Sequence, residues 1–247
     1  MHFPSVTSTS LLALEAAQLG ARGGVYIADE QTAGRGRGSH EWQSSPNDGL
    51  YISALVTPPI SMSYALWLPL ATGLAAQAAL KETTGLHADI RWPNDLLLNN
   101  RKCGGILVES AATTKETDPK TMLRYAVIGV GINVNQTDFP EPLRGLATSI
   151  RQAGCSVSRE LLLTALLRAL DLEIRNLILQ YRGTLNSSGL LERFTAASTW
   201  VHGKRVRVEE NGGYTGVTDG LDARGFLRVA GDDGVLHTVI SGGVRAL

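Results

Sequence analysis

Short apolar runs separated by turn residues predict the strands of the first two thirds of the chain. "GGVYIADE" and "LYISALVTP" predict two buried strands, the second ended by Pro58 and Pro59. "HADIRWPND" predicts a strand that runs into Pro93. "LLLNNRKCGGILVES" predicts a hairpin that turns at Asn99 and Asn100, because asparagine tolerates the positive φ of such turns. "LRYAVIGVGINVN" predicts a further strand with glycines at alternate positions.

Longer apolar patterns predict the helices. The alanine-rich stretch 64–80 indicates a buried core helix, because its polar residues and proline do not suit a membrane span. Ser10 is expected to cap a short helix over 11–19. Ser158 is expected to cap a long amphipathic helix over 159–181.

The pattern changes near Trp200. Beyond it, short apolar runs alternate with "NGG", "ARG", "GDDG" and "SGG", and five short strands in about fifty residues predict a small antiparallel barrel. The polar run 111–120 predicts a surface loop. The fold class is therefore α/β (α+β), with a mixed helix-and-strand domain over 1–198 and an all-β module over 199–247.

Composition narrows the functional classes. The chain has 247 residues with 23 basic and 23 acidic side chains, so the net charge is zero and gives no support for nonspecific binding to nucleic acid or membranes. Two cysteines, Cys103 and Cys155, make no disulfide framework. Glu15 interrupts the first apolar run and no basic segment precedes it, which argues against a signal peptide. A cytoplasmic protein is expected.

The loop "QTAGRGRGSHEW" is the first candidate for chemistry. Arg35 and Arg37 are two residues apart, so in an extended loop they project to the same side and can bind one anion together. The glycines Gly34, Gly36 and Gly38 let the backbone approach a ligand. The alternative is a solvated surface loop with incidental arginines.

The hairpin supplies a second candidate. A two-residue turn places Leu97 opposite Lys102 and Asp95 opposite Gly104, so that Asp95 and Lys102 form a diagonal pair roughly 7–8 Å apart. Gly104 then leaves the same face bare. An acid, a base and a bare patch indicate a pocket floor, although a plain salt-bridged hairpin remains the alternative.

Alternate residues of the segment "IGVGINVN" lie on opposite faces of a strand, so that one face belongs to the core and the other is bare. The bare face contains Gly129, Gly131, Asn133 and Asn135. A carboxamide offers a donor and an acceptor, which suits the edge of a nucleobase. The alternative is a strand packed closely against another backbone.

The hydroxyl-rich segment "TSTS" opens the first helix. Ser10 is assigned to capping, whereas Ser8 and Thr9 are candidates for ligand contacts, because helix N-termini favour polar or anionic groups.

These motifs together resemble those of the biotin–protein ligases. "EQTAGRGRGSHEW" resembles the adenylate-binding loop of that family, "RWPNDLLLNNRKCGGILVE" its central hairpin and "IGVGINVN" its adenine-side strand. The resemblance covers nearly the whole chain in order. It implies a class II synthetase-like biotin/lipoate ligase catalytic domain, with a mixed sheet flanked by helices, followed by an SH3-like β-barrel.

The resemblance also implies a reaction in two steps. Biotin and ATP form biotinyl-5′-AMP and pyrophosphate, and a lysine of a biotin carboxyl carrier protein domain then takes the biotinyl group and releases AMP. Preorganised cations stabilise the charge that develops on phosphorus oxygens. Mg²⁺ is expected to bridge the ATP phosphates, with Asp95 as its protein ligand. The loop is expected to open for substrates and to close over the anhydride.

Residue roles follow from the same resemblance. The catalytic residues are Arg37, Lys102 and Asp95. The residues that bind biotin and the reacting groups are Ser8, Thr9, Ser10, Gln31, Arg35, Gly36, Arg37, Lys102, Gly104 and Gly105. The residues that bind the nucleotide are Arg37, Trp42, Asn94, Asp95 and Asn133.

Three departures from the family pattern bear on these roles. Ser10 stands where asparagine is common, Arg91 where lysine precedes "WPND", and Ser39-His40 where a second glycine-arginine pair is usual. Only seven residues precede Ser8, so no DNA-binding domain and no repressor function are expected. Alternative functions are a lipoate/octanoate–protein ligase and a non-catalytic biotin-binding regulator. Strand edges in the larger domain would allow a homodimer.

Overall fold

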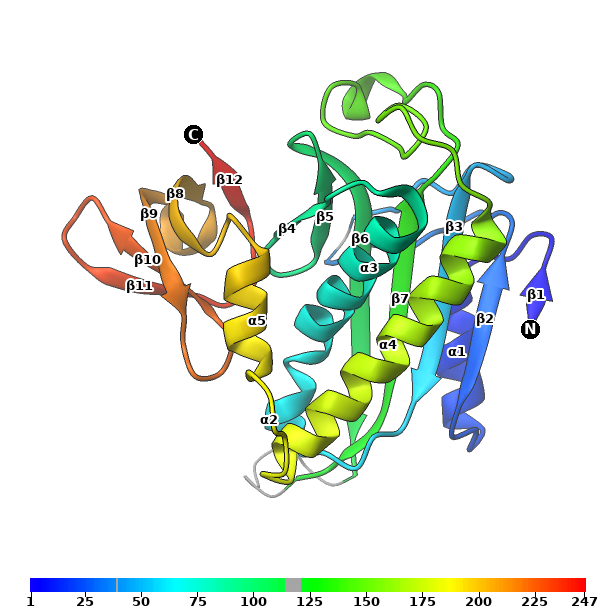
Figure 1. Cartoon of the computed structure of the whole chain (residues 1–247), viewed down its shortest axis with the longest axis horizontal. Helices are drawn as coiled ribbons and strands as arrows, with labels where there is room; N and C mark the ends of the chain where they lie inside the picture. Colours follow the sequence, from blue (N-terminus) through cyan, green and yellow to red (C-terminus); the bar gives the residue numbers. More distant parts are fainter. Residues whose placement is uncertain (39, 114–120) are drawn as a thin grey trace.

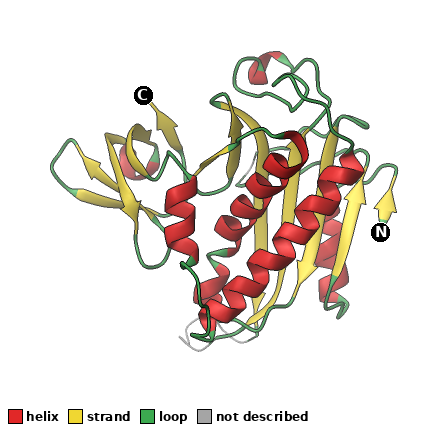
Figure 2. Cartoon of the chain, in the orientation of Figure 1, coloured by secondary structure: helices red, strands yellow, loops and turns green. Residues whose placement is uncertain are grey.

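The structure is a computed structural model that describes residues 1–38, 40–113 and 121–247. Ser39 lies outside the described residues. Residues 114–120 of the loop expected over 111–120 also lie outside them. Within them the chain forms a large mixed sheet with helices on both faces and a smaller antiparallel sheet at its C-terminal end (Figures 1 and 2).

The described residues of the first part form a seven-stranded sheet in the order β1-β2-β3-β7-β6-β5-β4. Neighbouring strands are antiparallel except β1 and β2, which are parallel. The strands are β1 (His2–Phe3), β2 (Gly24–Ala28), β3 (Gly49–Val56), β4 (Asp89–Arg91), β5 (Asp95–Leu98), β6 (Arg101–Ala112) and β7 (Leu123–Asn133). The expected strands are confirmed, and β1 is an addition that the pattern did not reveal.

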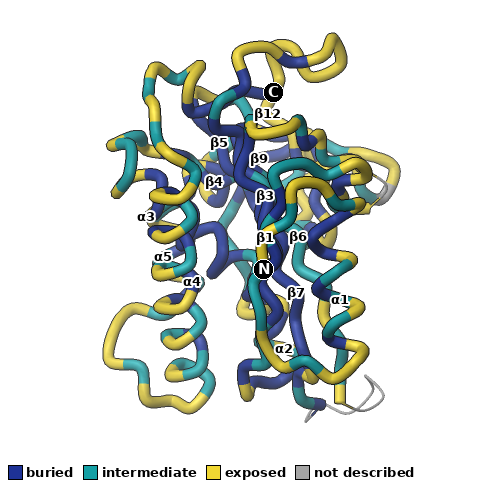
Figure 3. The backbone as a smooth tube through the Cα atoms, turned by 90° about the vertical axis from the view of Figure 1, so that its right-hand side faces the viewer, coloured by how far each residue is buried: buried dark blue, intermediate teal, exposed yellow. Residues whose placement is uncertain are grey.

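Helices cover the two faces of this sheet unequally (Figure 3). α3 and α4 pack side by side on one face, and α1 lies on the other. The helices are α1 (Thr9–Gln18), α2 (Met62–Ala65), α3 (Leu68–Thr84), α4 (Arg159–Tyr181) and α5 (Leu190–Ala197). α5 was not expected from the sequence.

The side chains of β3 point alternately to the two faces of the sheet, and each face has its own apolar core. Leu50, Ile52 and Ala54 belong to the main core beneath α3 and α4. Leu55 belongs to a smaller core beneath α1, together with Val127 of β7. Because α1 reaches only this end of the opposite face, the remainder of that face is available for a site. We call the face of the sheet on which α1 lies the α1 face.

Two of the three expected helix starts need correction. α1 begins at Thr9 with Ser8 at the N-cap, so Ser10 lies inside the helix and does not cap it. The alanine-rich helix α3 begins at Leu68, after the separate short helix α2. The third start is confirmed, because the Ser158 side chain accepts a hydrogen bond of 3.1 Å from the Leu161 N–H at the start of α4.

The described range 121–247 ends in a five-stranded antiparallel sheet in the order β11-β10-β9-β8-β12, as expected for the SH3-like module. Its strands are β8 (His202–Val208), β9 (Tyr214–Leu221), β10 (Leu227–Gly231), β11 (Leu236–Val239) and β12 (Val244–Ala246). The indole N–H groups of Trp67 and Trp92 donate to the backbone carbonyls of Arg224 and Gly225, at 2.8 and 3.0 Å. These bonds, and a shared apolar core, fix the module against the larger sheet.

Among the described residues, no helix combines the length and apolar character that a membrane crossing requires.

The cap of α4 gives a test of the fold. Replacing Ser158 by alanine removes the acceptor of the Leu161 N–H and is expected to lower the free energy of unfolding by about 1 kcal/mol. Urea denaturation measures this change. The matched control is Ser187→Ala, at an exposed loop position, which should leave the transition unchanged. Equal stabilities of the two variants would contradict the capping role.

Candidate functional site

A row of residues across five strands forms the floor of the site on the α1 face. Strand register pairs Tyr51 of β3 with Gly131 of β7, Gly131 with Gly105 of β6, Gly105 with Asp95 of β5, and Asp95 with Arg91 of β4. Side chains of paired residues emerge on the same face of a sheet. The two central positions carry no side chain, so the row has a bare patch between a buried tyrosine and a group of charges.

The hairpin β5–β6 has the expected turn, but its register differs from the prediction. Asn99 and Asn100 have φ values of 51° and 61°, and Leu97 lies opposite Lys102 as predicted. A bulge then shifts the pairing by one residue, so Gly105 and not Gly104 lies opposite Asp95. A Cβ at Gly104 would lie 2.9 Å from the Leu96 side chain, beneath the sheet. Gly104 therefore faces the core, and the bare position beside Asp95 is Gly105.

The bulge also buries Cys103. Its thiol is enclosed in the core, and burial raises its pKa to about 12. A thiol with that pKa is protonated at neutral pH, so Cys103 is no nucleophile.

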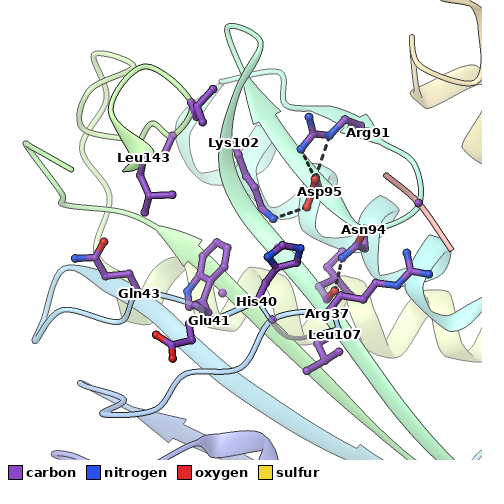
Figure 4. Close-up of a pocket in the computed structure, with 18 of the residues that line it drawn as sticks. Arg37, His40, Glu41, Gln43, Arg91, Asn94, Asp95, Lys102, Leu107 and Leu143 are labelled. Atoms are coloured by element: carbon purple, nitrogen blue, oxygen red, sulfur yellow. Dashed lines mark hydrogen bonds and ion pairs between the residues drawn. The ribbon is translucent and has the colours of Figure 1, made fainter. Parts of the chain in front are cut away.

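The predicted pairing of Asp95 with Lys102 is confirmed, and the two side chains form a direct ion pair. Lys102 Nζ lies 2.6 Å from Asp95 Oδ1, while Arg91 Nε and Nη2 lie 3.0 and 2.5 Å from Oδ2 (Figure 4). Burial alone would raise the pKa of the Asp95 carboxyl, but Lys102 and Arg91 outweigh it and hold the pKa below its ordinary value. Arg91, which sequence reasoning noted only as a family departure, completes this triad.

A neighbouring segment fixes the backbone of Lys102. The Lys102 N–H donates to the Leu146 carbonyl, and the Thr148 N–H donates to the Lys102 carbonyl, both at 2.9 Å. Lys102 and Ala147 thus form an isolated parallel bridge, which fixes the backbone at Lys102.

Trp42 lies over the bare patch. A Cβ built at Gly131 would be 2.5 Å from the indole, and one at Gly105 would be 2.9 Å from it. Any larger residue at either position would displace the indole. Lys102 Nζ is 5.5 Å from the centroid of the Trp42 ring, so the indole also borders the charged triad.

The described residues of the glycine-rich loop over 31–44, which we call the flap, form a narrow hairpin. The Trp42 N–H donates to the Gly34 carbonyl at 2.9 Å, and the Gly36 N–H donates to the His40 carbonyl at 2.8 Å. A Cβ at Gly34 would lie 2.3 Å from the Trp42 carbonyl oxygen, so the two legs can approach only at glycine. Gly38, near the tip, has a φ of 65°. The glycines thus shape the flap itself.

The flap arginines do not share one partner, contrary to the expectation. The two terminal nitrogens of the Arg35 guanidinium donate to Glu109 of β6, each at 2.9 Å. Figure 4 shows the Arg37 side chain leading away from Lys102. A Cβ at Gly242, in the C-terminal module, would lie 3.0 Å from Arg37 Nη1. Burial lowers the pKa of Arg37, opposed by the charges of Glu210 and Asp95.

Hydroxyl groups occupy the end of the site nearest α1. Thr9 Oγ1 and Ser10 Oγ lie 2.8 and 3.0 Å from Ser53 Oγ of β3, and Gln31 Oε1 accepts from the Thr9 N–H at 2.9 Å. Ser53, fully buried, was missed, and its only signal was a lone hydroxyl in an apolar strand. A Cβ at Gly129 would lie 2.9 Å from Ser10 Oγ, so that glycine keeps the sheet bare beneath the hydroxyls.

Ser8 stands apart from this group. It is buried, does not line the cavity, and its hydroxyl has no hydrogen-bond partner among the residues described.

Carboxamides occupy the opposite end. Asn133 Nδ2 donates to the Thr148 carbonyl at 2.9 Å, so its oxygen faces Gln136 Nε2 at 3.4 Å. Gln136, which sequence reasoning missed, is buried, and its Oε1 finds no donor within the described part of the chain. Asn135 lies beyond the strand end and contacts the Asn47 carbonyl at 3.4 Å, so it does not join the site.

These groups surround one cavity of about 1010 Å³. The expected residues that line it are Thr9, Ser10, Gln31, Arg35, Gly36, Arg37, Trp42, Asn94, Asp95, Lys102, Gly105 and Asn133. Asn94 also donates to the Ile106 carbonyl at 2.9 Å, which ties it to β6. The C-terminal module contributes Glu210 and the turn 241–243, whose place in the site the sequence did not indicate.

Asp95 does not fit the role of a metal ligand. Both of its oxygens already pair with cationic side chains, which would repel a divalent ion. Across residues 1–38, 40–113 and 121–247, no cluster of three or more His, Cys, Asp or Glu side chains could hold a metal.

The triad predicts a dependence of stability on pH. The pKa of Asp95 in the folded protein is lower than its ordinary value of 3.8. The carboxylate therefore stabilises the fold at pH values above 3.8, and this contribution is lost as the pH falls through the folded-state pKa. Asp95→Asn is expected to lower the free energy of unfolding at pH 7 by roughly 1–3 kcal/mol, because Lys102 and Arg91 lose their shared counter-charge. Urea denaturation at a series of pH values from roughly 2.5 to 7 measures the difference.

The control for this prediction is Asp171→Asn, which breaks an exposed pair with Arg175 on α4 and should cost less than about 0.5 kcal/mol. A stability difference between wild type and Asp95→Asn that persists unchanged at the acid end would contradict the assignment.

Comparison with known proteins agrees with this geometry. Residues 2–133 match the model of the Biotin/lipoate A/B protein ligase family, and residues 201–244 match the Biotin protein ligase C terminal domain. The chain is 34% identical over 246 residues to the biotin–[acetyl-CoA-carboxylase] ligase of Mycobacterium tuberculosis, a match that covers 96% of this chain and 84% of that protein.

Two further relatives place the match in context. The bifunctional ligase/repressor BirA of Bacillus subtilis is 41% identical over 151 residues. The match covers 60% of this chain and 45% of the relative, so the chain spans less than half the length of that protein. The biotin protein ligase of Aquifex aeolicus, solved in complex with biotin and ATP, superimposes with a TM-score of 0.77 at 26% identity and covers 99% of this chain and 97% of its own. The chain therefore belongs to the biotin/lipoate A/B protein ligase family and carries the C-terminal domain of the biotin protein ligases.

Proposed function

We propose that the protein is an ATP-dependent ligase that converts biotin into biotinyl-5′-AMP and transfers the biotinyl group to a lysine of a biotin carboxyl carrier protein domain. The observation that carries the proposal is the charged triad at the middle of one long cavity, with hydroxyls at one end and carboxamides at the other. The Aquifex aeolicus relative, solved with biotin and ATP, supports the choice of substrates.

The spacing of these groups along β7 suits an acyl-adenylate. Gly129, Gly131 and Asn133 alternate on the α1 face, and four residues of strand span roughly 13 Å. The hydroxyls of Thr9 and Ser10 would bind the ureido ring of biotin at the first end, and Ser53 behind them would hold both hydroxyls in place. The adenine would lie at the second end, near Asn133.

Lys102 would then act at the junction. Its ammonium is held over the centre of the site by Asp95, where the biotin carboxylate meets the α-phosphate of ATP. An anion attacking a polyphosphate is repelled, and charge grows on the phosphorus oxygens, so preorganised cations there lower the barrier. Asp95 has the role of a positioning group, because its charge keeps Lys102 and Arg91 fixed.

Arg37 supplies the second cation. In the structure it lies against Gly242, and we propose that it turns onto the phosphate as the flap adjusts to ATP. Trp42, Asn94 and His40 would border the nucleotide, because all three line the same cavity.

The second step needs an uncharged acceptor amine. The carrier lysine loses a proton, attacks the acyl carbon of the anhydride, and forms the amide as AMP departs. Enclosure by the flap keeps water from that carbon until the acceptor arrives.

Mg²⁺ would accompany ATP through its phosphates. Asp95 does not fit it as a ligand, so the proposal routes no step through a metal.

Three further features complete the proposal. The division into domains 1–198 and 199–247 is supported by the separate sheets. A monofunctional ligase without a nucleic-acid partner is supported by the zero net charge. A homodimer is supported by β6, whose pairing with β5 ends at Gly105 while β6 itself continues to Ala112.

A lipoate/octanoate–protein ligase is the nearest alternative, because the family model covers both classes. The C-terminal domain favours biotin. A non-catalytic biotin-binding regulator would not need the charged triad.

One experiment distinguishes these functions. The protein is incubated with Mg²⁺-ATP and either biotin or lipoate, and acyl-AMP and a mass shift on a carrier domain are followed by mass spectrometry. Biotinyl-AMP and biotinylated carrier are expected. Lipoyl-AMP alone would establish the sister activity, and the absence of any acyl-AMP would contradict an enzyme.

Lys102→Ala tests the assigned cation. Loss of the ammonium is expected to reduce the rate of biotinyl-AMP formation about 10²- to 10³-fold, while circular dichroism remains that of the wild type. Lys81→Ala, at an exposed site in the last turn of α3, is the matched control and should retain full activity. A Lys102→Ala variant with wild-type adenylation would overturn the assignment.

A further inference from the structure

The ion pair between Arg35 and Glu109 joins the flap to the sheet. Both terminal nitrogens of the guanidinium contact both carboxylate oxygens, each at 2.9 Å. The side chains are 38% and 27% exposed, so the pair lies at the rim of the cavity and not in bulk solvent. A planar, two-point contact of this kind fixes direction as well as distance.

The position of Glu109 on β6 explains how the pair is aligned. Gly105, Leu107 and Glu109 alternate onto the α1 face, and Glu109 pairs in register with Val127 of the core beneath α1. The carboxylate thus projects on the same face as the patch beneath Trp42, but roughly 13 Å farther along the strand.

The rest of the flap is held at other points. Its first leg is fixed by backbone bonds of 2.9 Å from the Thr32 and Ala33 N–H groups to the carbonyls of Val6 and Thr7. Its second leg is held by Trp42 on the two glycines. Between these contacts, residues 35–38, 40 and 41 line the cavity, and the bond to Glu109 is the described ion pair that ties this part to the large sheet.

We propose that Glu109 and Arg35 are positioning residues of the ligase reaction: the pair anchors the flap so that Trp42 stays over the bare patch and Arg37 stays within reach of the adenylate. The inference rests on the proposed function. Arg35 then acts through the flap and does not bind the phosphate itself, and Glu109, which ends the hairpin motif without a role in the proposed chemistry, gains one.

Charge reversal tests the pair directly. The variants are Glu109→Gln, Glu109→Arg, Arg35→Glu and the double variant Arg35→Glu/Glu109→Arg, which restores the pair with its charges exchanged. Arg35→Lys keeps the charge but loses the two-point geometry. Glu82→Gln is the control, because it removes a more exposed ion pair, with Arg168, between α3 and α4 and far from the flap. Thermal melting verifies that each variant is folded.

The first measurement is hydrogen–deuterium exchange of the segment 35–42 in the full chain without ligand. Glu109→Gln and either single reversal are expected to speed exchange about three- to fivefold, because a partly exposed pair shifts a local opening equilibrium by that order. The double variant should return to within about twofold of the wild type, and Arg35→Lys should lie between them. Glu82→Gln should not change exchange in this segment.

The second measurement is the fraction of biotinyl-AMP released into solution relative to that transferred to the carrier. Release is expected to rise about three- to fivefold in Glu109→Gln and to fall again in the double variant. Unchanged exchange in Glu109→Gln, or a double variant that stays as fast as the single reversals, contradicts the anchor. Loss of ATP binding in Arg35→Glu without rescue in the double variant shows Arg35 to be a phosphate ligand and also overturns it.

The two readouts separate the two hypotheses. A wild-type protein that makes no biotinyl-AMP refutes the proposed function, while exchange in the chain without ligand still decides the anchor. A wild type that makes biotinyl-AMP, with variants that match it in both measurements, refutes the anchor alone.

Discussion

The absence of side chains at Gly105 and Gly131 is the constraint on which the site depends. These residues are register partners at the centre of a five-strand row, and the indole of Trp42 fills the space that their side chains would take. A sheet that is close-packed on one face by α3 and α4 can therefore present bare backbone on the other. Because the strands carry the floor, its flatness does not depend on a loop.

The charged triad beside this patch turns a flat surface into one with a defined chemistry. Asp95 is buried between two cations, and the loss of hydration that would neutralise it is outweighed by Lys102 and Arg91. The same ion pairs fix Lys102, whose backbone is also bonded to residues 146–148. A cation held in place before the reaction needs no reorganisation when charge develops, which is the physical basis of the proposed adenylation.

The flap relates the two sheets to each other. It is bonded to the α1 end at its base, to β6 through Arg35, and lies against the turn at Gly242 of the C-terminal module through Arg37. The module is in turn bonded to Trp67, at the start of α3, and to Trp92, in the turn after β4. The cavity is thus enclosed by parts of the chain about 200 residues apart, and the C-terminal module contributes part of its wall.

The sequence by itself determined the local features: the strands, α4 with its cap, the turn at Asn99–Asn100 and the bare face of β7, because periodicity and turn chemistry act over a few neighbouring residues. The pairing of Asp95 with Lys102 followed from the turn alone. The tertiary structure decided the bulge that moved the bare position to Gly105, the bond of Arg35 to Glu109, and the places of Ser53 and Glu210. Each depends on contacts between distant segments, whose register and charge pairing are set by packing of the whole sheet and leave no mark on local sequence pattern.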